Sequence, residues 1–276
     1  MVWFSALYGL VGLIVGSFLN VVMDRLPAQQ SLLRPPSHCP QCGRQLTAGD
    51  LVPVVSYLVL RGRCRTCGAR IPLRVLLVEL VTGLLFAFLA WFFGPRVELA
   101  LNTVYTCFLL VILVIDLEHK LVLNVVILPA IVLALLAIPI QALVAEPSFA
   151  HLGLFWLIQR NRGMASLSIA QWTALSQLLG GLAAFLIFWL IWLIAPQGMG
   201  AGDVKLAAFA GLITAFPGAL VAVFSSFILG GVVGVVLLIT RLAGRKTAIP
   251  FAPFLVLTTF LYMLYGSRLL LWYFAG

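Results

Sequence analysis

Charged residues are scarce in this sequence: they make up 9% of its 276 residues, whereas 63% of the residues are hydrophobic. Histidine occurs only three times, and acidic side chains occur only eight times. About a quarter of the residues of water-soluble globular proteins are charged, so this composition excludes that class. The mean hydropathy is +1.16. Apolar runs of about 20 residues predict helices and not a β-barrel, so we expect an all-α polytopic membrane protein.

The features of a cleavable signal peptide are also lacking. The first apolar run is preceded by no basic residue and followed by no small-residue cleavage site, so residues 3–23 are expected to remain as a span. An extended basic face is missing as well, although the net charge is +9. Lysine and arginine lie in short segments between apolar runs, which is typical of membrane topology and gives no indication of nucleic-acid binding.

The apolar runs predict about eight transmembrane helices. We expect them over residues 3–23, 75–93, 99–115, 121–143, 172–195, 206–216, 219–240 and 251–274. Residues 24–74 are the one polar stretch, and they contain eight arginines. Because basic segments stay in the cytoplasm, this stretch is expected inside and the N-terminus outside. Alternation of the spans then places 13 of the 17 basic residues inside, which agrees with this orientation.

This pattern divides the chain into three predicted parts. They are a first transmembrane helix (1–23), a cytoplasmic loop domain (24–74) and a seven-helix membrane core (75–276). Residues 145–170 are expected to form an external loop, to which the sequence assigns no role.

Only five cysteines occur, and four of them form two CxxC pairs. Cys39 and Cys42 are separated from Cys64 and Cys67 by 21 residues, and a glycine follows each pair. Four thiolates at this spacing predict a closed, structural zinc site, since no coordination position is left open for chemistry. Two disulfides or a redox pair are the alternatives, which a reducing cytoplasm disfavours. Cys107 lies within an apolar run and is expected to be an inert packing residue.

Two further features flank the polar stretch. Gly9, Gly12 and Gly16 have helix-interface spacing in the first span, which predicts packing against a neighbouring helix. Glu79 is a carboxylate one turn into the second span. It is expected either to form a salt bridge with an arginine such as Arg74 or to take part in binding a substrate or cofactor, and both remain open.

Two aspartates stand at the ends of apolar runs. Asp116 follows residues 99–115, and Asp203 ends the sequence GMGAGD. An ionisable group at a bilayer is costly and commonly functional, and glycines let the backbone bend sharply and leave room for a substrate chain. The predicted topology places both aspartates at the cytoplasmic face, where two carboxylates can share a proton and act as acid and base. The alternative is a small-residue loop in which a solvated aspartate merely ends a span.

Other chemistry is open to these residues. Together with Asp116 and Asp203, His119 could complete a catalytic metal site, or it could orient the pair or contact lipid headgroups. Lys205 could neutralise part of the negative charge or extend to the headgroups. The aspartates could instead form the proton relay of a membrane transporter, although no inverted repeat or second broken helix is evident. A catalytically inactive scaffold is disfavoured because both aspartates are present.

Several motifs together resemble the type IV prepilin peptidase family, the bifunctional leader peptidases and N-methyltransferases of pili and type II secretion. The similarity runs along nearly the whole chain. It includes GSFLNV at residues 16–21, RLP at 25–27, the two CxxC pairs around PVVSY at 53–57, EL at 79–80, IDLEH at 115–119, GMGAGDVKL at 198–206 and IPFAPF at 249–254.

The resemblance implies a membrane aspartic endopeptidase in which Asp116 and Asp203 are catalytic. Its substrates would be prepilins and pseudopilins, cleaved at the cytoplasmic face of the bacterial inner membrane. It also implies N-methylation of the new N-terminal residue with S-adenosylmethionine. No GxGxxG-like methyltransferase fold is recognisable, so the methyl-donor site and the oligomeric state are left unassigned. The implied partners are the prepilin substrates and membrane lipid, and no nucleic acid is expected.

Three positions depart from the family pattern. Asn124 stands where many members have a second aspartate after a proline, and Leu123 replaces that proline. Ala252 replaces a glycine that is usual in the family's PFGP motif. The resemblance assigns catalysis to the aspartate that is retained as Asp116, so it still implies an active enzyme.

Overall fold

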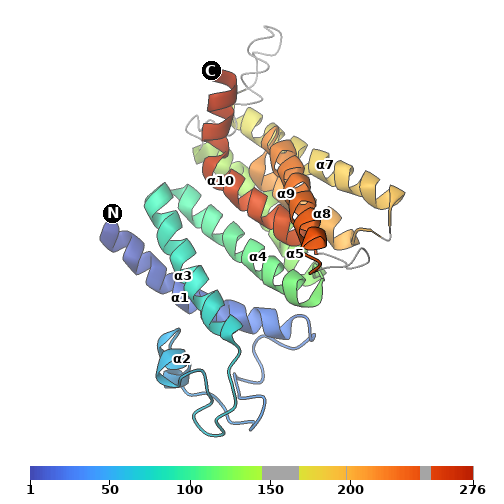
Figure 1. The fold of residues 1–276 in the computed structure, drawn as a ribbon. Coiled ribbons are helices and arrows are strands. Elements are labelled where there is room, and N and C mark those ends of the chain that lie inside the picture. Colours follow the sequence, from blue (N-terminus) through green and yellow to red (C-terminus); the bar gives the residue numbers. More distant parts are fainter. Residues whose placement is uncertain (145–167, 197, 243–249, 276) are drawn as a thin grey trace. The chain divides into compact units, whose positions relative to one another are not determined.

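The structure, a computed structural model, describes residues 1–144, 168–196, 198–242 and 250–275 (Figure 1). Most of the expected external loop at 145–170 therefore lies outside the described residues. The helices are α1 (Val2–Arg25), the short 3-10 helix η1 (Ala48–Asp50), α2 (Val55–Val59), α3 (Leu73–Phe93), α4 (Val97–His119), α5 (Asn124–Val144), α7 (Ile169–Ile194), α8 (Ala201–Thr214), α9 (Gly218–Ile239) and α10 (Ala252–Ala275).

The helices follow the apolar runs of the sequence. Within the described ranges, six are long and apolar enough to cross a membrane: α1, α3, α4, α5, α7 and α9. The two other expected spans correspond to α8, which has only 14 residues, and to α10. The prediction of an all-α polytopic membrane protein is confirmed, with eight as an approximate number of spans.

Contacts along the chain divide it into two units, residues 1–107 and 108–276, and the boundary falls within α4. In the first unit α1 and α3 run side by side, and the polar stretch between them carries α2 (Figure 1). In the second unit α7 packs on α8, α9 packs on α10, and α5 contacts both α7 and α8.

Glycines of α1 set the distance between α1 and α3. A Cβ atom at Gly12 would lie 2.7 Å from the Cβ of Phe86 and 2.8 Å from the carbonyl oxygen of Thr82. A Cβ at Gly16 would lie 2.9 Å from the Cα of Glu79. Lipid gives helices no hydrophobic reason to associate, so close packing at small residues takes that place. The packing predicted from the glycine spacing is therefore present.

Close backbone contact also joins α7 and α8 in the second unit. A Cβ at Gly211 would overlap the carbonyl group of Gly180. Elsewhere in this unit, the fully buried ring of Phe188 in α7 stacks on Phe227 in α9, with centroids 5.4 Å apart. Phe188 also lies 5.6 Å from the ring of Phe251, the residue before α10. These aromatic contacts hold the start of α10 against α7 and α9.

Replacing Gly12 by alanine should destabilise the protein, because the added methyl group forces α1 away from α3. Overpacking of this kind costs about 1–3 kcal/mol. The measurement is the apparent melting temperature of the purified protein in detergent. Gly231→Ala is the matched control, since a Cβ there meets nothing within 4 Å. If Gly12→Ala melts at the wild-type temperature, the close-packing argument is wrong.

Candidate active site and metal centre

The four cysteines of the two CxxC pairs meet at one point in the first unit. Their sulfur atoms all lie within 4.8 Å of one another, and the Sγ atoms of Cys39 and Cys67 are 3.8 Å apart. A tetrahedral zinc ion with Zn–S bonds of about 2.3 Å would hold its sulfur ligands about 3.8 Å apart. The cluster predicted from the sequence therefore fits a metal ion such as zinc.

Both cysteine pairs are built by the same local turn. Gly43 and Gly68, which follow the pairs, both have a φ of +69°, a conformation that glycine adopts without strain. Each donates its N–H to the carbonyl of the first cysteine of its pair, at 2.9 and 3.0 Å. Backbone hydrogen bonds from Cys67 and Thr66 lower the pKa of Cys64 to about 6. Such bonds favour the thiolate, which is the form that binds a metal.

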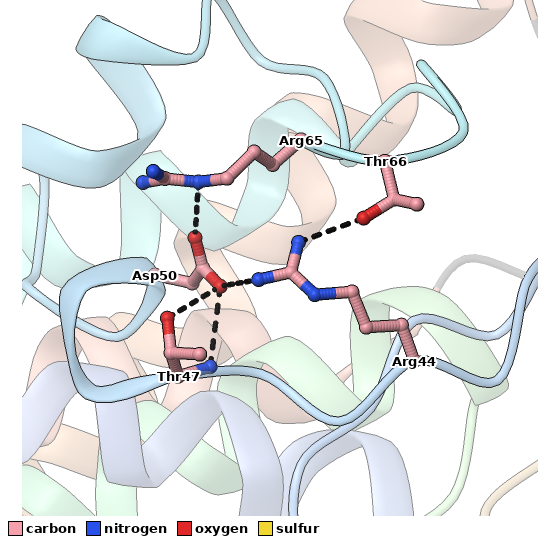
Figure 2. A network of polar contacts seen from close by, with 5 residues as sticks. All are labelled: Arg44, Thr47, Asp50, Arg65 and Thr66. Carbon is pink, nitrogen blue, oxygen red and sulfur yellow. Dashed lines mark hydrogen bonds and ion pairs between the residues drawn. The ribbon is translucent and has the colours of Figure 1, made fainter.

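Asp50 joins the two turns (Figure 2). Its Oδ2 accepts hydrogen bonds from the N–H of Thr47 at 3.1 Å, the hydroxyl of Thr47 at 2.8 Å and Nη2 of Arg44 at 2.8 Å. Its Oδ1 accepts a hydrogen bond from Nε of Arg65 at 3.0 Å. Arg44 follows the first pair and Arg65 lies inside the second, so one carboxylate ties both together. Hydrogen bonds from Thr47, followed by the charges of the arginines, lower the pKa of Asp50.

Glu79 holds the loop from within the helix pair. Its side chain is 5% exposed, and its Oε2 accepts a hydrogen bond from the N–H of Val54 at 2.7 Å. Arg74, the salt-bridge partner that the sequence offered, forms an ion pair with Asp24. The buried carboxylate therefore binds backbone of the PVVSY motif, a contact that sequence spacing did not indicate.

Asp116 and Asp203 approach each other in the second unit. Asp116 lies in the last turn of α4 and is 5% exposed, while Asp203 lies partly buried in the first turn of α8. The two carboxylates are close enough to interact as like charges. The N–H of Ala252 donates to Asp116, whose buried Oδ2 has no hydrogen-bond partner in the part of the chain that the structure describes. One buried carboxylate oxygen is thus available to a ligand.

Gly202 makes this approach possible. A Cβ at this position would lie 2.7 Å from the Cβ of Val122 and 3.2 Å from its carbonyl oxygen. Any side chain would therefore push α8 away from the segment that follows Asp116. Gly198, Gly200 and Gly202 all lack a positive φ. Glycine is needed at residue 202 because a side chain would not fit there, and not because the backbone adopts a conformation that other residues avoid.

The start of α8 has two more fixed contacts. Oδ2 of Asp203 accepts a hydrogen bond from the N–H of Gly200 at 3.2 Å, and the positive end of the helix dipole favours a carboxylate there. Nζ of Lys205 donates to Oδ1 of Asn124 at 2.6 Å. Asn124 begins α5, so this bond ties the starts of two helices together. The sequence did not predict it, because the two residues are 81 positions apart.

His119 does not join a metal site with the aspartates. It is exposed at the end of α4. Among the described residues, the only group of three or more metal-ligating side chains is the cysteine cluster. The catalytic-metal alternative therefore has no support in this structure.

These features define a class of protein: a multi-pass membrane protein with four clustered cysteines that could hold a metal ion and two carboxylates that approach each other at helix ends. Comparison with known sequences identifies the family. Residues 10–93 match the bacterial peptidase A24 N-terminal domain, and residues 103–235 match the type IV leader peptidase family.

Relatives match the chain almost from end to end. A prepilin leader peptidase/N-methyltransferase of Pseudomonas aeruginosa is 34% identical, over 94% of this chain and 90% of the relative. A protein of the same name from Bacillus subtilis is 31% identical, over 95% and 94% of the two chains. This chain therefore belongs to the type IV leader peptidase family. No solved structure gives a significant match.

Replacing Asp50 by asparagine should speed the loss of bound metal, because a neutral amide cannot form the charge-assisted hydrogen bonds to Arg44 and Arg65. The measurement is the rate of metal transfer to a coloured chelator. Since the pKa of Asp50 is lowered, its carboxylate helps to retain the metal at neutral pH. This stabilising effect is lost as the pH falls through the lowered pKa. Glu98→Gln, which removes a carboxylate from the first turn of α4, outside the polar stretch, is the control. Equal rates in all three proteins would contradict a stabilising role for Asp50.

Proposed function

We propose that this protein is a prepilin leader peptidase that also methylates the new N-terminus of its product. One observation carries the proposal: two aspartates approach each other from separate helices in a chain of the type IV leader peptidase family. The relatives from Pseudomonas aeruginosa and Bacillus subtilis are named for both activities, and this chain matches nearly their whole length.

In the proposed cleavage, Asp116 and Asp203 act as an acid–base pair. Neighbouring carboxyl groups disfavour each other's charge, so in this proposal one member of the pair is ionised and the other is protonated. The ionised member takes a proton from a water molecule, and the resulting oxygen attacks the scissile carbonyl carbon. The protonated member donates to the carbonyl oxygen and afterwards to the leaving amine. The two carboxyl groups have different surroundings: Oδ2 of Asp116 is buried without a partner among the described residues, whereas Oδ2 of Asp203 accepts the N–H of Gly200.

The proposed substrates are prepilins and pseudopilins, whose basic leader precedes an apolar helix. We place the N-terminus outside the bacterial inner membrane and both aspartates at its cytoplasmic face. The arginine-rich residues 24–74 support this orientation, because such segments are retained in the cytoplasm. In this arrangement residues 24–74 form a cytoplasmic domain between the first span (1–23) and the membrane core (75–276).

The proposed cofactors have different roles. One zinc ion bound by Cys39, Cys42, Cys64 and Cys67 would fix the shape of the loop, since four thiolates leave no open coordination position. S-adenosylmethionine would supply the methyl group for the second reaction. The transporter alternative has no observation in its favour, because both relatives above are named as enzymes.

Replacing Asp116 or Asp203 by asparagine should reduce leader removal by about 10²–10⁴-fold, the contribution of a general acid or base. The assay incubates purified protein with a prepilin and follows the shortened product on a gel. Glu98→Gln removes a carboxylate from the first turn of α4, at the other end of that helix from Asp116, and should cleave at the wild-type rate. Near-normal cleavage by either asparagine variant, with the protein still folded, would rule out the acid–base pair.

The orientation is tested with a reporter that is active only outside the cytoplasm. Fusion after residue 45 or 201 should give no signal, and fusion after residue 160 should give one. The reason is that alternating spans place the first two positions on the arginine-rich side. A signal at residue 201 would put Asp203 on the opposite face of the membrane from the proposed site.

A further inference from the structure

Two buried acceptors lie between α1 and α3: the carboxylate of Glu79, which accepts the N–H of Val54, and the amide oxygen of Asn20. Glu79 and Asn20 are each 5% exposed. Glu79 is not part of the ion pairs Arg44–Asp50, Arg65–Asp50 and Arg74–Asp24. Oδ1 of Asn20 is fully buried, without a hydrogen-bond partner in the described ranges. A carboxylate and an amide oxygen in this situation both call for a donor, and preferably for a positive charge.

The orientation of the Asn20 amide is fixed by its other end. Nδ2 donates to the carbonyl oxygen of Val75 at 3.0 Å. Turning the amide over would bring two oxygen atoms face to face, so Oδ1 must point away from that carbonyl. The unpartnered acceptor is therefore a consequence of the packing and not of an arbitrary choice between the two amide atoms.

Asn20 and Glu79 share one helix interface. Gly16 packs against the Cα of Glu79, and Asn20 follows Gly16 by one turn of α1. Val75, which accepts the hydrogen bond from Asn20, precedes Glu79 by one turn of α3. The two acceptors thus lie on facing sides of α1 and α3, at the end where the polar stretch leaves and re-enters the helix pair.

The loop over this interface is strained. The carbonyl of Pro53 accepts a hydrogen bond from the N–H of Val55 at 2.6 Å, around Val54 with φ +63° and ψ −51°. A three-residue turn of this hand is rare, and a β-branched side chain makes it less favourable. The turn persists because Glu79 accepts the N–H of Val54 at 2.7 Å. Backbone strain that the surroundings maintain in this way is concentrated at ligand sites.

We infer that Glu79 and Asn20 bind the cationic end of the methyl donor, with the strained turn at Val54 closing over it. The inference rests on the methyltransferase half of the proposed function. Beside its α-carboxylate, S-adenosylmethionine carries a sulfonium and an α-ammonium group, and either cation would offset the charge of the buried Glu79 carboxylate and interact favourably with the buried oxygen of Asn20. Glu79 is assigned to binding only.

The test measures binding of S-adenosylmethionine to the full-length protein in detergent by calorimetry. Glu79→Gln removes the charge but keeps an oxygen that can accept the N–H of Val54. It should weaken binding by about ten-fold or more, as expected for the loss of a hydrogen bond to a charged group. Methylation should fall in parallel, and leader removal should remain close to wild type. Binding of the donor by Glu79→Gln at the wild-type affinity would overturn the inference.

Two comparisons sharpen the result. S-adenosylhomocysteine lacks the sulfonium charge and keeps the ammonium group. If Glu79→Gln weakens the binding of both compounds equally, Glu79 contacts the ammonium group. If it weakens only the binding of S-adenosylmethionine, Glu79 contacts the sulfonium. Glu98→Gln makes the same chemical change in the first turn of α4, outside the polar stretch, and should bind like wild type; an equal loss there would reduce the effect to general electrostatics and overturn the site.

Wild-type protein also decides the matter if Glu79→Gln does not fold. The donor should slow hydrogen exchange in the peptide that contains Val54, and unchanged exchange at saturating donor would overturn the inference. If the wild-type protein removes leaders but binds neither S-adenosylmethionine nor S-adenosylhomocysteine, the cation site is wrong and the peptidase assignment is retained. A protein that binds the donor but cleaves no prepilin would overturn the peptidase and leave the cation site.

Discussion

Direct contact between helix backbones at glycine is the constraint on which both polar sites depend. Gly16 brings α1 onto the Cα of Glu79, and Gly202 lets α8 lie against Val122. Without these contacts the carboxylates would be separated by side chains or reached by lipid. Because a bilayer offers helices no hydrophobic reason to associate, small residues decide where polar groups can be enclosed.

The two units contain different polar groups. Residues 1–107 contain the cysteine cluster and the Glu79–Asn20 interface, and residues 108–276 contain Asp116 and Asp203. The two family matches, to residues 10–93 and 103–235, divide the chain in nearly the same place. A chain with two proposed reactions thus has a separate polar centre in each unit, and a change in one centre can be read out against the activity of the other.

Hydropathy and local spacing predicted most of the fold and one of the centres. A bilayer requires long apolar helices, so their positions are visible as runs in the sequence. The cysteine turns are local, and their spacing with Gly43 and Gly68 was sufficient to predict the cluster. Topology placed Asp116 and Asp203 on one face, but their closeness depends on a packing contact at Gly202 that only coordinates can reveal.

What the sequence did not predict are contacts between residues that are distant in the chain. In the sequence, nothing distinguishes Asp50 from other loop carboxylates. Its ion pairs with Arg44 and Arg65 are visible only in the structure. The bond between Lys205 and Asn124 joins two helix starts, and nothing in either local sequence points to the other. Such contacts follow from side-chain packing, for which a single sequence has no periodic signal.

The ion pair between Asp24 and Arg74 closes the polar stretch at its base. Arg25, the last residue of α1, also holds the start of the polar stretch, because its guanidinium donates hydrogen bonds to the carbonyls of Ser31 and Leu32 at 2.9 and 3.3 Å. The entropy cost of closing a flexible loop rises slowly with its length, by about 0.6 kcal/mol for each doubling. The stretch therefore behaves as a module inserted between two helices. Over evolution it can gain or shed residues between its fastened ends while the membrane helices beneath it keep their packing.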